Sequence, residues 1–445
     1  MIQIFNRYIP SNLFLYFIFE NVFIFLFVIW GSAFKGMTPN LFLVPLACQI
    51  ALHYSDLNLH TPQFPLKNFL RKHLFAIFWT ALIFFGLYRL LPLPPFTWNP
   101  ITIRLVLSPL ILIGLRFGYH SMVTTHKLDT SILIIGSGSN GTLVKEALSQ
   151  NKGFGYRVLH FNQGLGSPST NNDTWKKLTE VVSKERIKKI VVALKDRRGQ
   201  LPVKLLLNLR VQGIEVVDAV NFYEQIAGKI CVKTLNPSTL IFGRGFNRLE
   251  ILRISKRILD ILTSLIGIML ALPMFIILPI LIKLTSQGPV FYRQVRVGEK
   301  GNPFTLIKFR SMVQDAESKS GPVWAVENDS RVTWFGKIMR ALRLDELPQL
   351  INVLKGEMSF VGPRPERPVF VKQLQEKIPY YDLRFSVKPG LTGWAQVKYR
   401  YGSTEEDALE KLQYDLYYVK HLSLLFDMTI IFETIQVVLR GKGAR

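Results

Sequence analysis

The chain has 445 residues, too many for a single ordinary domain, and 49% of them are hydrophobic. Charged residues make up only 19%, which points away from a disordered chain and favours contact with a membrane. The net charge of +24 indicates anionic partners, and because the basic residues are interleaved with apolar runs we expect lipid or anionic substrates and no nucleic acid. Cys48 and Cys231 lie far apart, which predicts a reduced compartment without disulfides.

Four apolar segments open the chain, and three of them approach the ~20 residues that span a bilayer. They cover residues 12–33, 40–54, 73–91 and 101–123. Most flanking cations lie on one side, so the positive-inside rule places both ends of this block in the cytoplasm, although Lys35, Arg89 and Arg104 fall on the other side. A buried soluble helical bundle is the alternative, and it is disfavoured because the runs have no polar face.

The next part of the chain has the pattern of a doubly wound parallel sheet, with strands separated by helical stretches. The predicted strands are residues 131–135, 156–161, 189–194 and 215–219. A glycine loop, GSGSNG at 136–141, follows the first strand and could hold a pyrophosphate at the start of a helix. The second strand ends in His160 and Phe161 with no acidic residue to bind a ribose, so we expect a structural or regulatory Rossmann-like domain without a bound dinucleotide.

An apolar run at residues 258–282 contains Pro273 and Pro279 and has basic clusters on both sides. A spanning helix would place one basic cluster outside the cell, and a proline in mid-helix removes a backbone hydrogen bond. Both facts favour a helix-break-helix hairpin that enters one leaflet and returns, with the break near Pro273. A fifth spanning helix is the alternative.

Two adjacent carboxylates, Asp345 and Glu346, stand in the sequence LDELPQ just after Arg340 and Arg343. A carboxylate pair among fixed cations suits a site that handles phosphate esters, since one carboxylate can attack phosphorus while the other holds Mg²⁺. The alternative is a helix that carries both residues on its solvated side.

Further candidates for anion binding lie on either side of this pair. Lys308 and Arg310 are two residues apart, so on a strand they would share a face. Pro363 and Pro365 fix φ on both sides of Arg364 and would orient its guanidinium, whose planar fork suits phosphate. The chain ends in an apolar helix that we expect on the membrane surface.

Seven linked motifs in about the last 195 residues carry a family resemblance; they lie at 257–260, 288–291, 308–312, 344–349, 352–365, 389–397 and 414–420. Together they resemble the bacterial sugar transferase family, the monotopic polyprenyl-phosphate phosphoglycosyl transferases. The preceding parts resemble long-form members, which start exopolysaccharide, capsule or O-antigen synthesis. One departure is Leu272 before Pro273, where some relatives have serine; it could change how the break is capped but not the chemistry.

The resemblance implies that a sugar 1-phosphate is transferred from a UDP-sugar to undecaprenyl phosphate, with release of UMP. The family's nucleophile, which forms a covalent aspartyl intermediate, maps onto Asp345, and its Mg²⁺ ligand maps onto Glu346. Arg364 is expected to hold a phosphate. Four other residues in or beside matching motifs are expected to line the substrate site: Lys308, Arg310, Gln396 and Arg400.

The expected fold is thus a membrane protein of mixed α/β class in three parts. Residues 1–125 form four transmembrane helices, 128–248 a Rossmann-like domain, and 250–445 a mainly α catalytic domain with the re-entrant helix. The catalytic domain is expected on the cytoplasmic face of the bacterial inner membrane, in contact with membrane lipid, and a homodimer is compatible with a long-form member. Residues from 250 onward should retain residual activity alone.

Two other functions stay open. A membrane-bound nucleotide-sugar dehydratase or epimerase would use the glycine loop, but it needs a Tyr-x-x-x-Lys pair, and Tyr417 and Lys420 have the wrong spacing. A non-enzymatic assembly scaffold would recruit later glycosyltransferases and would not need Asp345. The identity of the transferred sugar is also open.

Overall fold

The computed structural model describes residues 2–4, 7–9, 11–29, 130–136, 138–150, 156–161, 172–194, 201–235, 250–314, 329–399 and 404–439. It also describes scattered positions between 72 and 122 and a few single residues elsewhere. These residues form a mixed α/β protein of two compact units, Met1–Ala227 and Gly228–Arg445. The predicted segment 40–54 and about half of each of the segments 73–91 and 101–123 lie outside the described residues.

The first predicted apolar segment is helical through most of its length, as α1 (Ser11–Ile29). A short antiparallel pair precedes it, formed by β1 (Ile2–Ile4) and β2 (Arg7–Ile9). Glu20 of α1 is buried and accepts a hydrogen bond of 2.7 Å from Nε of Arg116. Neither side chain is therefore a lone buried charge.

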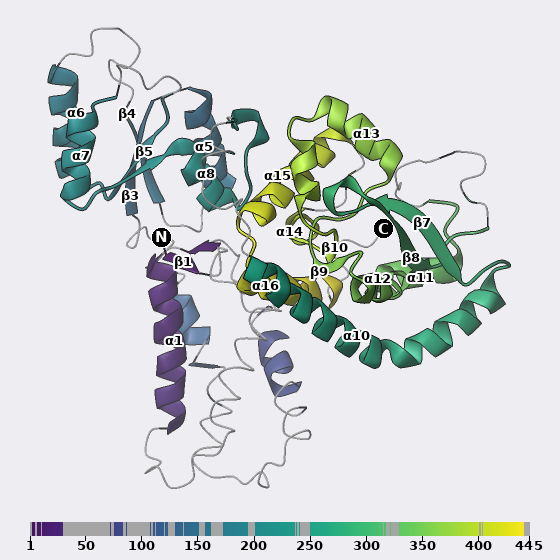
Figure 1. Cartoon of the computed structure of the whole chain (residues 1–445). Coiled ribbons are helices and arrows are strands. Elements are labelled where there is room, and N and C mark those ends of the chain that lie inside the picture. The colour runs from purple at the N-terminus through teal and green to yellow at the C-terminus, as the bar shows by residue number, and fades with distance from the viewer. Residues whose placement is uncertain are drawn as a thin grey trace. The chain divides into compact units, whose positions relative to one another are not determined.

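A parallel sheet forms the core of the first unit, as the alternation of strand and helix patterns predicted. Its strands run in the order β4-β3-β5-β6 and are all parallel. They are β3 (Thr130–Ile135), β4 (Tyr156–Phe161), β5 (Lys189–Val192) and β6 (Glu215–Asp218). Helices cover both faces (Figure 1), namely α5 (Ser139–Gln150), α6 (Asn172–Lys184), α7 (Val203–Val211) and α8 (Ala219–Ala227).

The glycine loop joins β3 to α5 at the position that the sequence predicted. Gly136 has φ +104°, and a Cβ added there would lie 3.1 Å from the backbone carbon of Ala193. A Cβ on Gly141 would lie 3.0 Å from the carbonyl oxygen of Gly136. Glycine is therefore required here by backbone conformation and by close packing of the helix on the strand.

The second unit begins with residues 228–235, which include a short 3₁₀ turn, η2 (Val232–Thr234), and continues with the long helix α10 (Glu250–Thr285). A hairpin and a small parallel pair supply its strands: β7 (Phe291–Val297), β8 (Pro303–Phe309), β9 (Ser359–Val361) and β10 (Gly390–Thr392). Its other helices are α11 (Trp334–Ala341), α12 (Gln349–Lys355), α13 (Pro368–Lys377), α14 (Trp394–Lys398), α15 (Glu405–Lys420) and α16 (Leu424–Leu439). The 3₁₀ turns are η3 (Glu299–Gly301), η4 (Leu344–Glu346) and η5 (Tyr381–Ser386).

Helix α10 continues through Pro273 and Pro279, so the predicted break near Pro273 is wrong in this structure. The ribbon curves along its length instead of separating into two helices (Figure 1). A proline removes one hydrogen bond and bends a helix, but the remaining bonds of the ladder can carry the helix past it. Within the described residues, α10 is the one helix long and apolar enough to cross a membrane.

Polar contacts fix the first half of α10 to the second unit. Arg257 donates to the carbonyl oxygens of Val353 and Leu354, both at 2.6 Å, and so satisfies the end of α12. Lys256 donates to the carboxylate of Asp427 on α16 at 2.6 Å. These contacts explain why the first half of this helix carries Lys256 and Arg257 within an otherwise largely apolar sequence.

Asp260 also lies on the first half of α10 and is almost fully buried. Its Oδ1 atom accepts hydrogen bonds of 2.9 Å from the hydroxyl of Ser359 and from the backbone N–H of Phe360. The carboxylate thereby joins α10 to the start of β9.

Apolar contacts fix the second half of the same helix. Leu278 and Ile282 are buried against Phe309 of β8 and Met339 of α11. The opposite side of α10 is exposed and apolar along both halves, as shown by Ile258, Leu262, Leu265, Met269, Ile276 and Ile280. Both halves of α10 therefore pack on one domain while an apolar face remains uncovered.

Replacing Asp260 with alanine should lower the free energy of unfolding of the purified protein by about 2 kcal/mol, because two buried donors lose their acceptor. Thermal unfolding in detergent, followed by circular dichroism, measures the change. Asp260→Asn keeps one acceptor oxygen and should lose less. An alanine variant that melts with the wild type would show that this carboxylate does not fix α10.

Candidate active site

The carboxylate pair lies in the interior of the second unit. Asp345 and Glu346 belong to the 3₁₀ turn η4 between α11 and α12 and are 7% and 8% exposed. Arg343, which precedes the turn, has φ +54°, a left-handed conformation that is uncommon for a residue with a Cβ. The pair is therefore not on the solvated side of a helix, and the backbone directly before it adopts a rarely used conformation.

Three cations surround the carboxylate of Glu346. Its Oε1 atom lies 2.7 Å from an Nη2 of Arg364 and 3.2 Å from Nζ of Lys308, and its Oε2 atom lies 3.6 Å from Arg343. Burial opposes ionisation of Glu346, but Arg364, Lys308 and Arg343 outweigh it and hold the pKa of this carboxyl well below its usual range. Glu346 is thus a fixed negative charge within a cationic site.

Asp345 has a different environment although it is the next residue. Burial raises the pKa of its carboxyl, since the charges of Lys308, Arg340 and Arg364 compensate only in part. Among the described residues no hydrogen-bond donor contacts its side chain. An ionised carboxylate that accepts no hydrogen bond is more reactive toward an electrophile than one that is already hydrogen-bonded.

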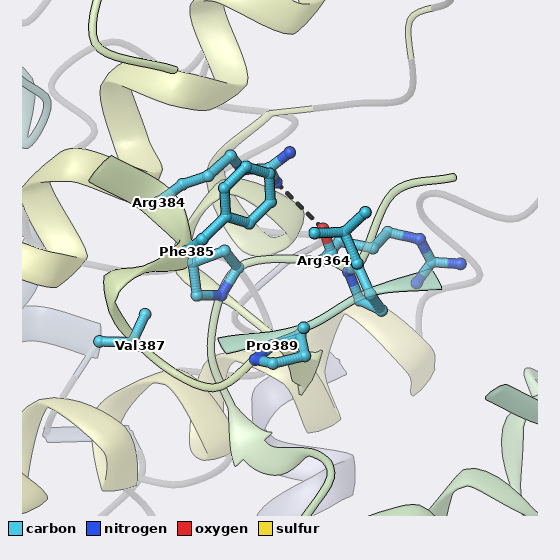
Figure 2. A pocket seen from close by; sticks show the side chains of 9 residues that line it. Arg364, Arg384, Phe385, Val387 and Pro389 are labelled. Atoms are coloured by element: carbon cyan, nitrogen blue, oxygen red, sulfur yellow. Dashed lines mark hydrogen bonds between the residues drawn. The ribbon is translucent and has the colours of Figure 1, made fainter. Parts of the chain in front are cut away.

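The loop of residues 362–366, here called the Pro-Arg-Pro loop, holds Arg364 in place from its backbone. Its carbonyl oxygens at 363, 364, 365 and 366 accept hydrogen bonds from Gly390 N, Arg384, Arg296 and Val297 N, respectively, at 2.9–3.0 Å. Figure 2 shows Arg384 reaching the carbonyl of Arg364, whose own guanidinium extends in the opposite direction. Four carbonyl oxygens of the loop are therefore engaged by neighbouring elements, while the guanidinium of Arg364 is left to contact Glu346.

Buried groups support Arg384 in turn. It donates 2.8 Å to the carboxylate of Asp415 and 2.6 Å to the hydroxyl of Tyr381. Sequence reasoning did not single out this trio. The available signal was Asp415, a charged residue on the face of α15 that also carries Leu412 and Leu416, both fully buried. A small pocket lies beside this support, lined by Arg364, Arg384, Phe385, Val387 and Pro389 among others (Figure 2).

The structure separates Lys308 from Arg310. Lys308, on β8, contacts Glu346, whereas Arg310, just beyond the strand, donates 2.8 Å to the backbone and the hydroxyl oxygens of Ser286. A Cβ on Gly288 would lie 2.1 Å from Arg310, so the guanidinium crosses that glycine. No contact between Arg310 and Glu346 is seen within the described residues.

Two other predicted substrate residues have different outcomes. Gln396, on α14, donates to the carbonyl of Leu391 at 3.3 Å, and its buried Oε1 atom has no protein donor within the described part of the chain. Arg400 lies outside the described residues. Gln349, the last residue of the LDELPQ motif, is 2% exposed and its amide nitrogen has no acceptor among the described residues. Buried polar atoms of this kind are commonly completed by a ligand or by water.

The carboxylate oxygens of the pair are of the ligand type that Mg²⁺ prefers. Within the described residues no group of three or more acidic, histidine or cysteine side chains gathers as a metal cage. Mg²⁺ does not require such a cage, because it commonly binds one or two carboxylates together with water and substrate phosphates. Glu346, with Asp345 beside it, would hold the ion in that manner and would need the cations around it to turn toward the phosphates.

The family model for bacterial sugar transferases matches residues 251–441, which contain the whole of this site. An Aeromonas hydrophila protein named UDP-N-acetylgalactosamine-undecaprenyl-phosphate N-acetylgalactosaminephosphotransferase is 48% identical over 190 residues, covering 43% of this chain and 45% of that protein. A Bacillus subtilis protein, named as a candidate undecaprenyl-phosphate N-acetylgalactosaminyl 1-phosphate transferase, is 56% identical over 29% of this chain and 72% of its own. The UDP-glucose:undecaprenyl-phosphate glucose-1-phosphate transferase of Escherichia coli is 32% identical over 68% of this chain and 66% of its own. The chain belongs to the bacterial sugar transferase family.

Proposed function

We propose that this protein transfers a sugar 1-phosphate from a UDP-sugar to undecaprenyl phosphate and releases UMP. The observation that carries the proposal is the contrast within the carboxylate pair: Glu346 is held by three cations, while Asp345 is buried beside them and accepts no hydrogen bond from any described residue. The relatives named above act on undecaprenyl phosphate, in keeping with this assignment. The reaction would be the initiating step of exopolysaccharide, capsule or O-antigen synthesis.

The proposed chemistry has two displacements at one phosphorus atom. The carboxylate of Asp345 attacks the phosphorus that carries the sugar, the bond to the UMP oxygen breaks, and UMP leaves with that electron pair. A phosphate oxygen of undecaprenyl phosphate then attacks the same phosphorus and displaces Asp345. The products are the diphosphate-linked sugar and the free carboxylate.

The cations have a direct part in this scheme. Lys308, Arg343 and Arg364 can exchange their contacts with Glu346 for the phosphate oxygens of the donor, where negative charge accumulates. Mg²⁺ bound at Glu346 would neutralise the diphosphate and the departing UMP. The buried Oε1 of Gln396 is available to accept a hydrogen bond from the substrate.

We also propose that α10 enters the membrane from one side and does not span it. Its first half is fixed to α12, α16 and β9 and its second half to β8 and α11, all in the same domain. A straight span would carry these two halves to opposite faces of the bilayer. The exposed apolar face would lie among lipid tails, with the catalytic domain on the cytoplasmic face of the inner membrane.

The donor sugar to test first is N-acetylgalactosamine. The relatives named for this sugar are 48% and 56% identical, whereas a relative named for glucose from Klebsiella pneumoniae reaches 44%. The purified protein should release UMP from UDP-N-acetylgalactosamine with undecaprenyl phosphate and Mg²⁺, faster than from UDP-glucose. Release with UDP-glucose alone would correct the sugar, and no release with any UDP-sugar would oppose the proposed function.

Asp345→Asn should lower UMP release by about a thousandfold or more, because an amide cannot form the acyl phosphate. A second readout is covalent labelling: wild-type protein, but not the variant, should gain the mass of a phosphosugar when acceptor is omitted. Glu376→Gln, an exposed change on α13, is the matched control and should behave as wild type. Near-normal turnover by the Asn variant would remove the covalent scheme and favour a scaffold function.

Glu346→Gln should both slow UMP release and raise the Mg²⁺ concentration needed for half-maximal activity, because the amide is a weaker ligand for a hard cation. A magnesium titration of initial rates, after chelation with EDTA, measures the shift against the wild type and Glu376→Gln. An unchanged titration midpoint in a slower enzyme would place Glu346 outside the metal site.

A further inference from the structure

Residues 228–235, here called the linker segment, follow α8 in the chain but are built into the second unit. Ile230, Cys231 and Val232 are at most 5% exposed. Ile230 and Val232 belong to the same buried cluster as Leu416 and Tyr417 of α15. Part of the buried core of the second unit is therefore supplied by Ile230 and Val232, which precede the expected start of the catalytic part at residue 250.

Specific polar contacts accompany this burial. The backbone N–H of Ile230 donates 3.0 Å to the carbonyl of Gln413, and Lys229 pairs with Glu410 on α15. Gly228 has φ +62°, and its carbonyl oxygen accepts a hydrogen bond of 2.8 Å from the indole N–H of Trp394. The linker segment thus has a defined register against α14 and α15.

Trp394 connects this segment to the backbone beside the candidate site. The indole is 3% exposed and packs edge-on against Phe426, with ring centres 5.0 Å apart. Gly393, the preceding residue, lies so close to Gly362 that a Cβ on it would be 2.1 Å from the carbonyl oxygen of Gly362. Gly362 begins the Pro-Arg-Pro loop.

We propose that the linker segment is a positioning element of the transfer site. By holding Trp394 it sets the contact of Gly393 with Gly362, and through the Pro-Arg-Pro loop it sets the place from which Arg364 reaches Glu346. This rests on the proposed function, since it assigns the segment a part in the same reaction. A segment that only fills the core would change stability and leave the kinetic constants of folded enzyme unaltered.

The first test uses three variants of the full chain. Ile230→Ala with Val232→Ala loosens the segment, and Trp394→Phe removes the donor to Gly228 while keeping an aromatic ring. Leu374→Ala, a buried change on α13 in the same cluster, is the control for lost core packing. Rates are measured well below the unfolding midpoint of every variant.

The Ile230→Ala/Val232→Ala variant and the Trp394→Phe variant should each show a rate constant of UMP release about tenfold lower at saturating donor. A loss of this size is expected when a phosphate-binding group is displaced by up to about 1 Å. The Leu374→Ala control should keep its rate constant although it melts earlier. Rates that follow the melting temperatures of all variants alike would overturn the positioning role.

A second test does not depend on turnover. A protease site inserted between residues 241 and 249 of the full chain allows the covalent connection to be cut after folding. The fragment that ends in the linker segment should stay bound to the rest, and wild-type protein so cut should keep its UMP release. Fragments that separate in detergent would overturn the placement of the segment, whereas failure of uncut wild type to release UMP would oppose only the proposed function.

Discussion

The backbone of the Pro-Arg-Pro loop is the constraint on which the candidate site depends. Four consecutive carbonyl oxygens accept hydrogen bonds from β7, η5 and the start of β10, so elements far apart in the chain must all be in place before the loop can form. The prolines remove most of the remaining freedom in φ. The entropic cost of ordering the backbone at Arg364 is thus met during folding and not during substrate binding.

This constraint also explains how two adjacent carboxylates can share a buried site. Ionised carboxylates repel each other in a medium of low dielectric constant, and burial alone would keep them protonated. Lys308, Arg343 and Arg364 compensate the charge of one of them, Glu346, whereas no donor in the described part of the chain contacts the other. In the proposed reaction these cations would exchange Glu346 for phosphate oxygens at the same site, where negative charge accumulates.

The sequence pattern of apolar and turn residues correctly predicted the elements whose structure depends mainly on residues close to one another in the chain. The strand predictions agree with β3 to β6 within a residue or two, because buried parallel strands are short apolar runs between turn signals. The pairing of Lys308 and Arg364 with Glu346 follows motifs that the resemblance had assigned to one site. Their joint contact is a finding of the structure, since no spacing rule connects residues 308, 346 and 364.

The structure differs from the sequence-based predictions where contacts between distant parts of the chain determine the local conformation. Arg310 was expected to share a face with Lys308, but β8 ends at Phe309 and the next residue turns toward Ser286. Pro273 signals a bend, yet packing of both halves of α10 on one domain keeps the helix continuous. The support of Arg384 by Asp415 and the burial of the linker segment join parts of the chain that are 31 or more residues apart, which sequence periodicity does not report.

The attachment of both halves of α10 to one domain has a consequence for the lipid environment. A helix that spans a bilayer must match its hydrophobic length to the hydrocarbon thickness or tilt to compensate. In the placement proposed above, a curved helix fixed at both halves would have its insertion depth set by the protein and not by the far leaflet. The height of the carboxylate pair above the lipid tails would then be the same in thin and thick bilayers, so that a phosphate at the headgroup level meets the same geometry in each.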